Sequence, residues 1–348
     1  MMQTIFPYLL DIIFFSSLLI SIFSLSFSKK RDESFFWVLV FFSAIVLAIK
    51  PFGIAVDDPN YLKLYENIIA PLSLIEGLNY TARDPIYYIS LKLTSGIVGV
   101  YSFNLIAVTV FIIKMFFLSK LVDKKTIAFF TYFSLSFILH DLTQLRLSMA
   151  MMFVFAFMYF YMIRKKIYSS LLMLVFATLS HFQGLLAAPF LLIYGSRLHW
   201  WVFWIPLIIA LTHYFNFFGF FAFFFTTLIP LQSIFVDRYL DSAADQYFFA
   251  EFFITHWILL TCLMLSTGLF QNNRFALWGI TGVIASTLSI MLFSSVAAMA
   301  VRLNEFYLVF LFLLMGYIDS KRSKFLPFIL LIGSIGLFYI RNRYLGVI

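Results

Sequence analysis

The chain has 348 residues, of which 63% are hydrophobic and 11% are charged, and its mean hydropathy is +0.99. Average soluble domains carry about 25% charged residues, so this composition excludes an ordinary soluble domain. The net charge of +8 reflects Lys and Arg at the ends of apolar stretches and does not indicate nucleic-acid binding. With Cys262 as the single cysteine, a disulfide within the chain and a cysteine-based metal site are also excluded.

Apolar stretches of roughly 20 residues recur along the whole chain, and each is long enough to cross a bilayer core of about 30 Å. Because lipid cannot satisfy backbone polar groups, these stretches predict an all-α, polytopic membrane bundle. The first stretch, 5–27, lacks a basic leading region, so we expect a retained helix and not a signal peptide. About twelve transmembrane helices are expected, with centres near residues 16, 43, 108, 132, 154, 174, 188, 207, 260, 284, 309 and 333.

The basic residues predict how these spans are oriented. All the clusters fall on one side if both termini lie outside, and the positive-inside rule makes that side cytoplasmic. The prediction requires stretch 167–194 to be split at His181 into two short helices, because one long helix would reverse every later span. We then expect a single membrane domain, 1–348, with outer loops at 57–99 and 215–251. The clusters are Lys29 to Arg31, Lys120 with Lys124 and Lys125, Arg164 to Lys166, Arg197, Arg274, and Lys321, Arg322 and Lys324.

The first outer loop contains two Asp-Pro steps, at Asp58 and Asp84, and the second follows Arg83 directly. One interpretation is purely structural, because Asp is a good helix cap and Pro fits the first turn. The other interpretation is functional. A helix that starts at Asp58 places Tyr61 and Tyr65 on one face, and an acid beside aromatic rings can bind sugars.

A short outer hairpin carries His140 and Asp141, and Arg146 follows at the head of the apolar helix 147–163. A cation at a helix N-terminus opposes the helix dipole, so Arg146 needs an anionic partner. Asp141 is the structural candidate for that partner. A substrate phosphate is the functional one, because Arg binds phosphate through two parallel hydrogen bonds.

The remaining polar residues that are predicted on the outer side lie further along the chain. His181 ends the sixth predicted span, either as a structural residue or as a general base near neutral pH. Arg238 and Tyr239 lie in the second outer loop, where a solvated turn is the alternative. Arg302 precedes Glu305 by three residues, so the two can pair with each other on a helix. All these polar residues, several of them cations, are predicted on one side of the membrane, which favours an anionic substrate there.

Five segments resemble, in chain order, the EpsG/Wzy-like family of bacterial polysaccharide polymerases. Segment 144–150 with Arg146, the basic turn 164–166 and the helix end 179–181 with His181 form the longest resemblance. Segments 50–61 and 83–89 resemble the family's first outer loop, with Lys50 in place of Arg. The resemblance leaves open whether Asp57 or Asp58 is the family's acid. Weaker similarities are at Arg238 with Tyr239 and at Arg302 with Tyr307.

The resemblance implies a GT-C-like membrane glycosyltransferase, such as an O-antigen polymerase, at the periplasmic face of the bacterial inner membrane. It would transfer a growing undecaprenyl-diphosphate-linked glycan onto a lipid-linked repeat unit, without a metal or other cofactor. A chain-length regulator is a candidate protein partner. We expect His181 to be the base, with Asp58 as second choice, and Arg146 and Arg302 to hold the diphosphate. Expected substrate-binding residues are Tyr61, Arg83, Asp84, His140, Asp141, Arg238 and Tyr239.

Three other functions use similar substrates. A ligase would move the finished glycan onto a lipid core, and only its acceptor differs. A flippase or transporter would need polar groups along both halves of the membrane, whereas the predicted inner halves carry little beyond Lys114. A dolichol-phosphate-type glycosyltransferase would favour an acidic pair with a metal, and Asp57 with Asp58 keeps that alternative open.

Overall fold

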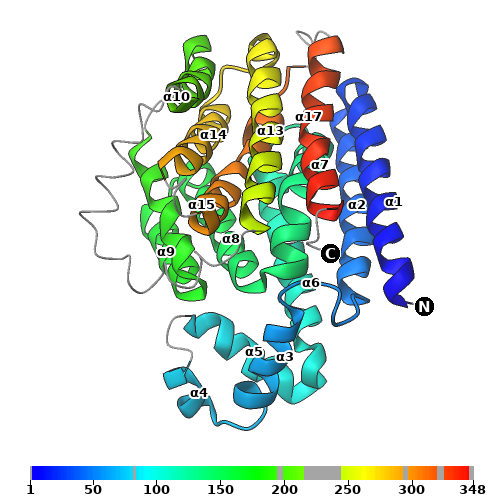
Figure 1. Ribbon diagram of the computed structural model, residues 1–348, viewed down its shortest axis with the longest axis vertical. Helices are drawn as coiled ribbons and strands as arrows, with labels where there is room; N and C mark the ends of the chain where they lie inside the picture. The colour runs from blue at the N-terminus through cyan, green and yellow to red at the C-terminus, as the bar shows by residue number, and fades with distance from the viewer. Residues whose placement is uncertain are drawn as a thin grey trace. The chain divides into compact units, whose positions relative to one another are not determined.

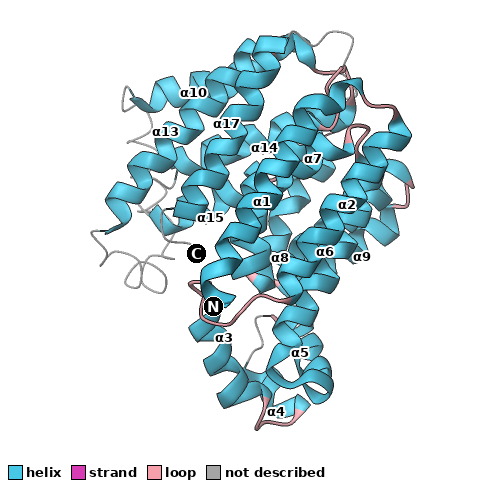
Figure 2. Ribbon diagram, turned by 90° about the vertical axis from the view of Figure 1, so that its right-hand side faces the viewer, coloured by secondary structure: helices cyan, strands magenta, loops and turns pink. Residues whose placement is uncertain are grey.

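Helices form all the regular structure of this computed structural model (Figure 1), which describes every residue except 1, 81–83, 194–198, 215–243, 293–296, 320–324 and 345–348. Figure 2 shows no strand among the described residues. These residues fall into two compact units, 1–194 with 342–348 and 195–341. The all-helical prediction is confirmed, whereas the single membrane domain stays a prediction.

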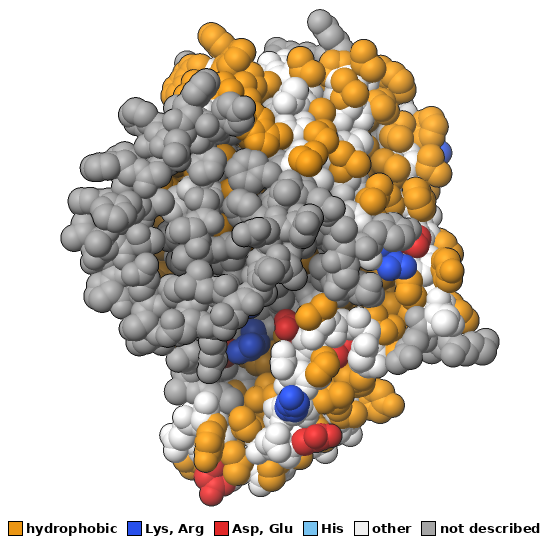
Figure 3. Space-filling model, viewed as in Figure 1, with side chains coloured by type: hydrophobic (Ala, Val, Ile, Leu, Met, Phe, Trp, Pro, Cys, Tyr) orange, Lys and Arg blue, Asp and Glu red, His pale blue; other side chains and the backbone are white. Residues whose placement is uncertain are grey.

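Six helical stretches of the described residues are long and apolar enough to cross a membrane. Further apolar helices are shorter, at 10–17 residues. Apolar side chains also cover most of the described surface in Figure 3, and many large ones, such as Leu19, Phe41 and Tyr168, are exposed. These features indicate an integral membrane protein, because lipid is the solvent that such a surface tolerates. The number of twelve spans and the GT-C-like architecture stay predictions.

The first unit is a bundle built around one buried helix. Its helices are α1 (Met2–Phe23), α2 (Lys29–Ala48), α3 (Asp58–Leu64), α4 (Leu74–Tyr80), α5 (Pro85–Val98), α6 (Ser102–Leu121), α7 (Lys125–Tyr132), α8 (Leu145–Met158) and α9 (Ile167–Ser180). The π-helix η4 (Phe133–Thr143) continues α7, and every residue of 126–143 is buried. Phe129, Phe133 and Phe137 stack along this central helix, with ring centroids 5.8 and 4.5 Å apart. Burial of such aromatic rings is a large part of bundle stability.

Basic residues gather at one end of this bundle. The Lys124 ammonium donates to the carbonyls of Ser24 and Leu25 at the end of α1, and the Lys125 ammonium lies 2.7 Å from the Glu33 carboxylate on α2. The ring of Phe117, near the end of α6, lies 5.5 Å from that of Tyr159, which precedes the turn 164–166. The first three basic clusters therefore share one end, as predicted.

The opposite end of the bundle is formed by α3, α4 and α5 (Figure 1) and by the residues they contact. Asn104, at the start of α6, donates to the Lys50 carbonyl at 2.9 Å. The Lys50 ammonium in turn donates to the Leu142 carbonyl at 2.6 Å, just before α8 begins. Segment 57–99, the predicted first outer loop, is thus mostly helical where it is described, and it is held against the start of α8.

The break predicted at His181 is confirmed. Helix α9 ends at Ser180, His181 is extended, and the 3₁₀ helix η6 (Phe182–Leu192) turns back against α9. Gly184 makes this turn possible, because a Cβ there would lie 2.4 Å from the backbone of Ala177. The tight turn holds the His181 side chain at the same end of the unit as α5.

The second unit contains α10 (Trp204–Tyr214), α13 (Ala244–Leu265), α14 (Arg274–Leu292), α15 (Ala297–Leu308), α16 (Leu311–Met315) and α17 (Phe325–Tyr344), whose last residues belong to the first unit. Helix α14 packs against α15 and α16. The side chain of Asn304 donates to the Ser286 carbonyl at 3.2 Å, which ties α15 to α14 inside this unit.

Candidate active site

An acid, a guanidinium and an imidazole from three separate segments meet in the first unit. Arg146 Nη1 donates to Asp84 Oδ2 at 2.9 Å, and His181 Nδ1 lies 3.2 Å from Asp84 Oδ1. In sequence, Asp84 is 62 residues from Arg146 and 97 from His181, so only the tertiary structure brings them together. We call these three residues the Asp84 cluster.

Asp84 occupies the N-cap position of α5, but its carboxylate makes no capping hydrogen bond to that helix. Pro85 starts the helix instead, as it does at many first turns. Burial alone would raise the pKa of Asp84, but the hydrogen bond and charge of His181, followed by Arg146, outweigh it and lower the pKa below its usual value. Asp84 is therefore an anion at neutral pH, and the purely capping interpretation is wrong for this side chain.

Arg146 is the only exposed residue between positions 145 and 151. Its side chain is 51% exposed, whereas that of Asp84 is 9% exposed. The anionic partner that Arg146 needs is Asp84 and not Asp141, because Asp141 pairs with Lys114 inside the bundle. Because Asp84 engages one nitrogen of an exposed guanidinium, the other N–H donors of Arg146 can bind an external anion.

His181 presents its ring to Asp84 through Nδ1. An ionised carboxylate only accepts hydrogen bonds, so Nδ1 carries the hydrogen and Nε2 is the nitrogen that can take a proton from a substrate. The ring also lies edge-on to Phe182, with centroids 4.9 Å apart. Asp84 thereby orients the imidazole, with Nε2 in the position from which a general base could act, while it also holds Arg146.

A second group of contacts fixes the start of α8, which carries Arg146. The Tyr61 hydroxyl accepts a hydrogen bond from the Leu145 N–H at 2.9 Å. The side chain of the N-cap residue, Gln144, makes no capping hydrogen bond to this helix. Asp58 is saturated, because Oδ1 accepts from the Lys50 ammonium at 2.6 Å and Oδ2 accepts from two backbone N–H groups. Burial lowers the pKa of Lys50, although Asp58 raises it. These contacts favour a structural role for Asp58.

Replacement of Tyr61 by Phe should loosen the start of α8. The Leu145 N–H is buried and would lose its acceptor, at a cost of about 1–3 kcal/mol. We expect a lower free energy of unfolding for Tyr61→Phe in detergent micelles. Tyr65→Phe, one turn later in the same loop, is the control and should change little. Equal stability of the two variants would show that the hydroxyl of Tyr61 does not cap α8.

Further inside the first unit than the Asp84 cluster, an ion pair lies entirely within the bundle. Lys114 on α6 pairs with Asp141 on η4, and both side chains are fully buried. The Lys114 ammonium also donates to Tyr132 at 2.6 Å and to Ser148 at 2.8 Å, and both hydroxyls donate to Asp141. This network ties α6, α7 with η4, and α8 together two residues beyond Arg146.

His140 is buried next to this network. Its Nδ1 lies 2.7 Å from the Ser136 hydroxyl, and its Nε2 has no hydrogen-bond partner among the described residues. A structural role for Asp141 follows from its ion pair. A direct substrate contact of His140 or Asp141 would require the substrate to penetrate the bundle, because both residues are at most 1% exposed.

The structure thus brings Asp84, Arg146 and His181 together and places Tyr61 beside them. Arg302 is an exposed residue of α15 in the second unit, and its predicted role stays a prediction. Three predicted residues, Arg83, Arg238 and Tyr239, lie outside the described residues. The part of the chain that is described contains no group of three or more His, Cys, Asp or Glu side chains that could hold a metal ion.

Sequence reasoning missed the roles of Lys50, Lys114 and Tyr132. A lysine inside an apolar span was a usable signal, because a charge within a membrane demands a partner. No sequence signal identified Asp141 as that partner, or Asp58 as the partner of Lys50. These pairings join residues 27 and 8 positions apart through the folded bundle.

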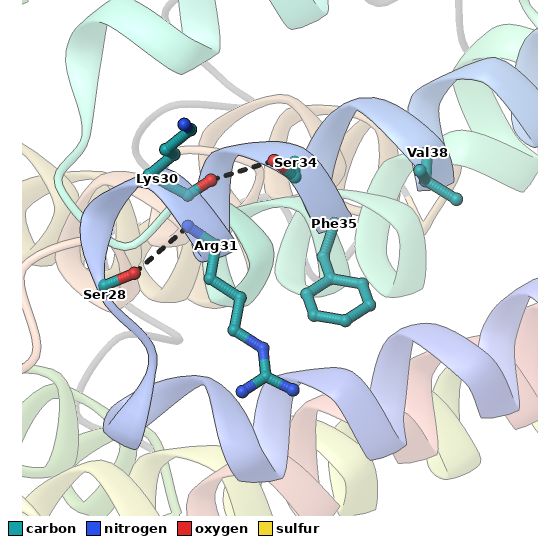
Figure 4. Close-up of a pocket in the computed structure, with 6 residues that line it drawn as sticks. All are labelled: Ser28, Lys30, Arg31, Ser34, Phe35 and Val38. Carbon is teal, nitrogen blue, oxygen red and sulfur yellow. Dashed lines mark hydrogen bonds between the residues drawn. The ribbon is translucent and has the colours of Figure 1, made fainter.

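A surface hollow lies at the start of α2, at the basic end of the first unit (Figure 4). In it the Ser28 hydroxyl accepts from the Arg31 N–H, and the Ser34 hydroxyl donates to the Lys30 carbonyl. The Arg31 guanidinium stacks on Phe27, 4.7 Å from the ring centroid. None of the described residues that line this hollow is an acid or a histidine, and the hollow lies at the end opposite to the Asp84 cluster, so we do not place the active site there.

Comparison with known proteins adds one finding. The model of the EpsG family matches residues 34–346, which include all three members of the Asp84 cluster. No curated protein and no solved structure matches the chain.

Proposed function

Because the chain belongs to the EpsG family, we propose that it is a membrane glycosyltransferase that polymerises lipid-linked repeat units of a surface polysaccharide, such as O-antigen. The observation that carries this proposal is the Asp84 cluster, in which an exposed guanidinium lies next to a carboxylate-oriented imidazole. The first group suits a diphosphate, and the second suits removal of a proton from a sugar hydroxyl.

The proposed reaction transfers a glycan from undecaprenyl diphosphate to the end sugar of another lipid-linked unit. The bond between the anomeric carbon and the diphosphate oxygen breaks, and the diphosphate leaves with the bonding electrons. The acceptor hydroxyl oxygen forms the new glycosidic bond, and its proton passes to Nε2 of His181. Arg146 stabilises the negative charge that develops on the diphosphate, usually the largest contribution to such catalysis.

The distribution of charge supports a periplasmic site. The basic clusters of the first unit gather at one end, and the positive-inside rule assigns that end to the cytoplasm. The Asp84 cluster, at the opposite end, would then face the periplasm of a bacterial inner membrane.

Replacement of His181 by Gln should slow polymerisation by roughly 100-fold or more, the usual contribution of a positioned base. The amount of the variant in the membrane should stay unchanged, so the loss should appear as less polymer formed per unit time. Polymerisation at the normal rate by His181→Gln would show that His181 is structural.

Deletion of the gene, followed by gel analysis of the surface polysaccharide, tests the proposed function. A polymerase defect leaves single repeat units on the surface. Complete loss of surface glycan would indicate a ligase or a flippase, and a shortened repeat unit would indicate an ordinary glycosyltransferase. The last two outcomes would refute the proposal.

A further inference from the structure

Tyr87, two residues after Pro85 on α5, carries a buried polar atom that the fold itself does not use. The residue is 2% exposed, and its hydroxyl has no hydrogen-bond partner among the described residues. A buried hydroxyl without a partner costs about 1–3 kcal/mol. A Phe in this place would fill nearly the same volume without that cost, so packing alone does not account for the phenol.

The surroundings of this hydroxyl are those of the candidate active site. Tyr87 follows Asp84, the N-cap residue of α5 and the partner of Arg146, by three residues, so the two lie on the same face of the chain at the start of α5. The ring lies 6.4 Å, centroid to centroid, from that of Tyr61, which caps the helix of Arg146. The unused donor therefore belongs to the start of α5, which carries Asp84 and packs near Tyr61 at the start of α8.

The next residue, Tyr88, has a hydroxyl that does make a hydrogen bond within the fold. The hydroxyl of Tyr88 donates to the Ser73 carbonyl at 3.2 Å, and its ring packs against Gly77 on α4. Tyr88 thus connects α4 to α5, whereas the ring of Tyr87 lies near that of Tyr61. Both are nearly fully buried, at 1% and 2% exposed, so the two residues form a matched pair for experiment.

We propose that the Tyr87 hydroxyl donates a hydrogen bond to a phosphoryl oxygen of the lipid diphosphate, next to Arg146. This inference rests on the proposed function and adds a specific substrate-binding residue to it. A phenol is a donor that stays neutral near pH 7, so it can stabilise an anion without repelling the nearby guanidinium. Because the hydroxyl is buried, the bound diphosphate reaches it only when the start of α5 moves away from the start of α8. Binding then satisfies the hydroxyl, which explains why the fold keeps it.

Tyr87→Phe and Tyr88→Phe in the full-length protein, reconstituted in liposomes, test this proposal. We expect Tyr87→Phe to keep or raise the melting temperature, to bind undecaprenyl diphosphate about 10- to 100-fold more weakly, and to polymerise correspondingly more slowly. Tyr88→Phe should show the opposite pattern, a lower melting temperature with unchanged affinity for the folded protein.

Three results would overturn the inference while the proposed function stands. They are unchanged undecaprenyl diphosphate binding by Tyr87→Phe, a lower melting temperature of this variant, which would reveal an internal partner of the hydroxyl, and a loss confined to the affinity for the acceptor unit. Failure of the unmodified protein to bind undecaprenyl diphosphate or to polymerise would instead refute the proposed function, and this inference with it.

Discussion

Arg146→Ala should abolish long-chain polysaccharide while the protein remains in the membrane. Its half-exposed guanidinium is held by Asp84, and removal of a preorganised group that stabilises developing negative charge typically costs about 100- to 1,000-fold in rate. We expect a gel to show single repeat units in place of a ladder, with an unchanged amount of protein in the membrane fraction.

Two further variants separate charge from geometry at this position. Arg146→Lys keeps the positive charge but loses the planar fork that binds two phosphate oxygens, so it should recover only part of the activity. Arg164→Ala removes a basic residue from the turn after η5 (Tyr159–Ile163), outside the Asp84 cluster, and should leave chain length unaltered. A normal ladder from Arg146→Ala would refute the role of Arg146 in diphosphate binding.

Neutralisation of only one member of the Lys114–Asp141 pair should destabilise the protein strongly. Both side chains are fully buried, and loss of one partner from such a pair leaves an uncompensated charge that costs about 3–5 kcal/mol. We therefore expect Lys114→Gln and Asp141→Asn each to lower the melting temperature in detergent, and to lower the amount of protein in the membrane.

The double variant Lys114→Gln with Asp141→Asn should recover most of this stability. The two amides can hydrogen-bond to each other and to Tyr132 and Ser148, so no isolated charge remains. If the double variant loses as much free energy of unfolding as the two single variants lose together, the interaction between the two residues does not contribute to stability.

Hydropathy, the polar step at His181 and the basic clusters were enough to predict much of the fold. The apolar stretches predicted helices throughout, and the polar step at His181 correctly predicted the break between α9 and η6. The shared end of Arg146 and His181 in the first unit also followed from the placement of the basic clusters. These features depend on local composition, which a sequence displays directly.

The choice of partners within the site could not be predicted in the same way. Asp141 is close to Arg146 in sequence, and the polar residues predict that it lies with His140 in a short outer hairpin. That prediction is wrong, because both residues are buried in the π-helix η4, where Asp141 pairs with Lys114 on α6. Composition indicates a loop at these residues, whereas the partner that lets Asp141 stay inside the bundle comes from another helix. Asp84 pairs with Arg146 and His181 across long stretches of chain, which no periodicity encodes.

Reconstitution of the purified protein in liposomes, with an undecaprenyl-diphosphate-linked repeat unit as the only source of sugar, tests the central claim most directly. The account predicts a ladder of lipid-linked polymers and release of undecaprenyl diphosphate, without a nucleotide sugar, and no ladder when Asp84, Arg146 or His181 is replaced by Ala. Transfer only from a nucleotide sugar or from a lipid monophosphate sugar, or an intact ladder from the three Ala variants, would contradict it.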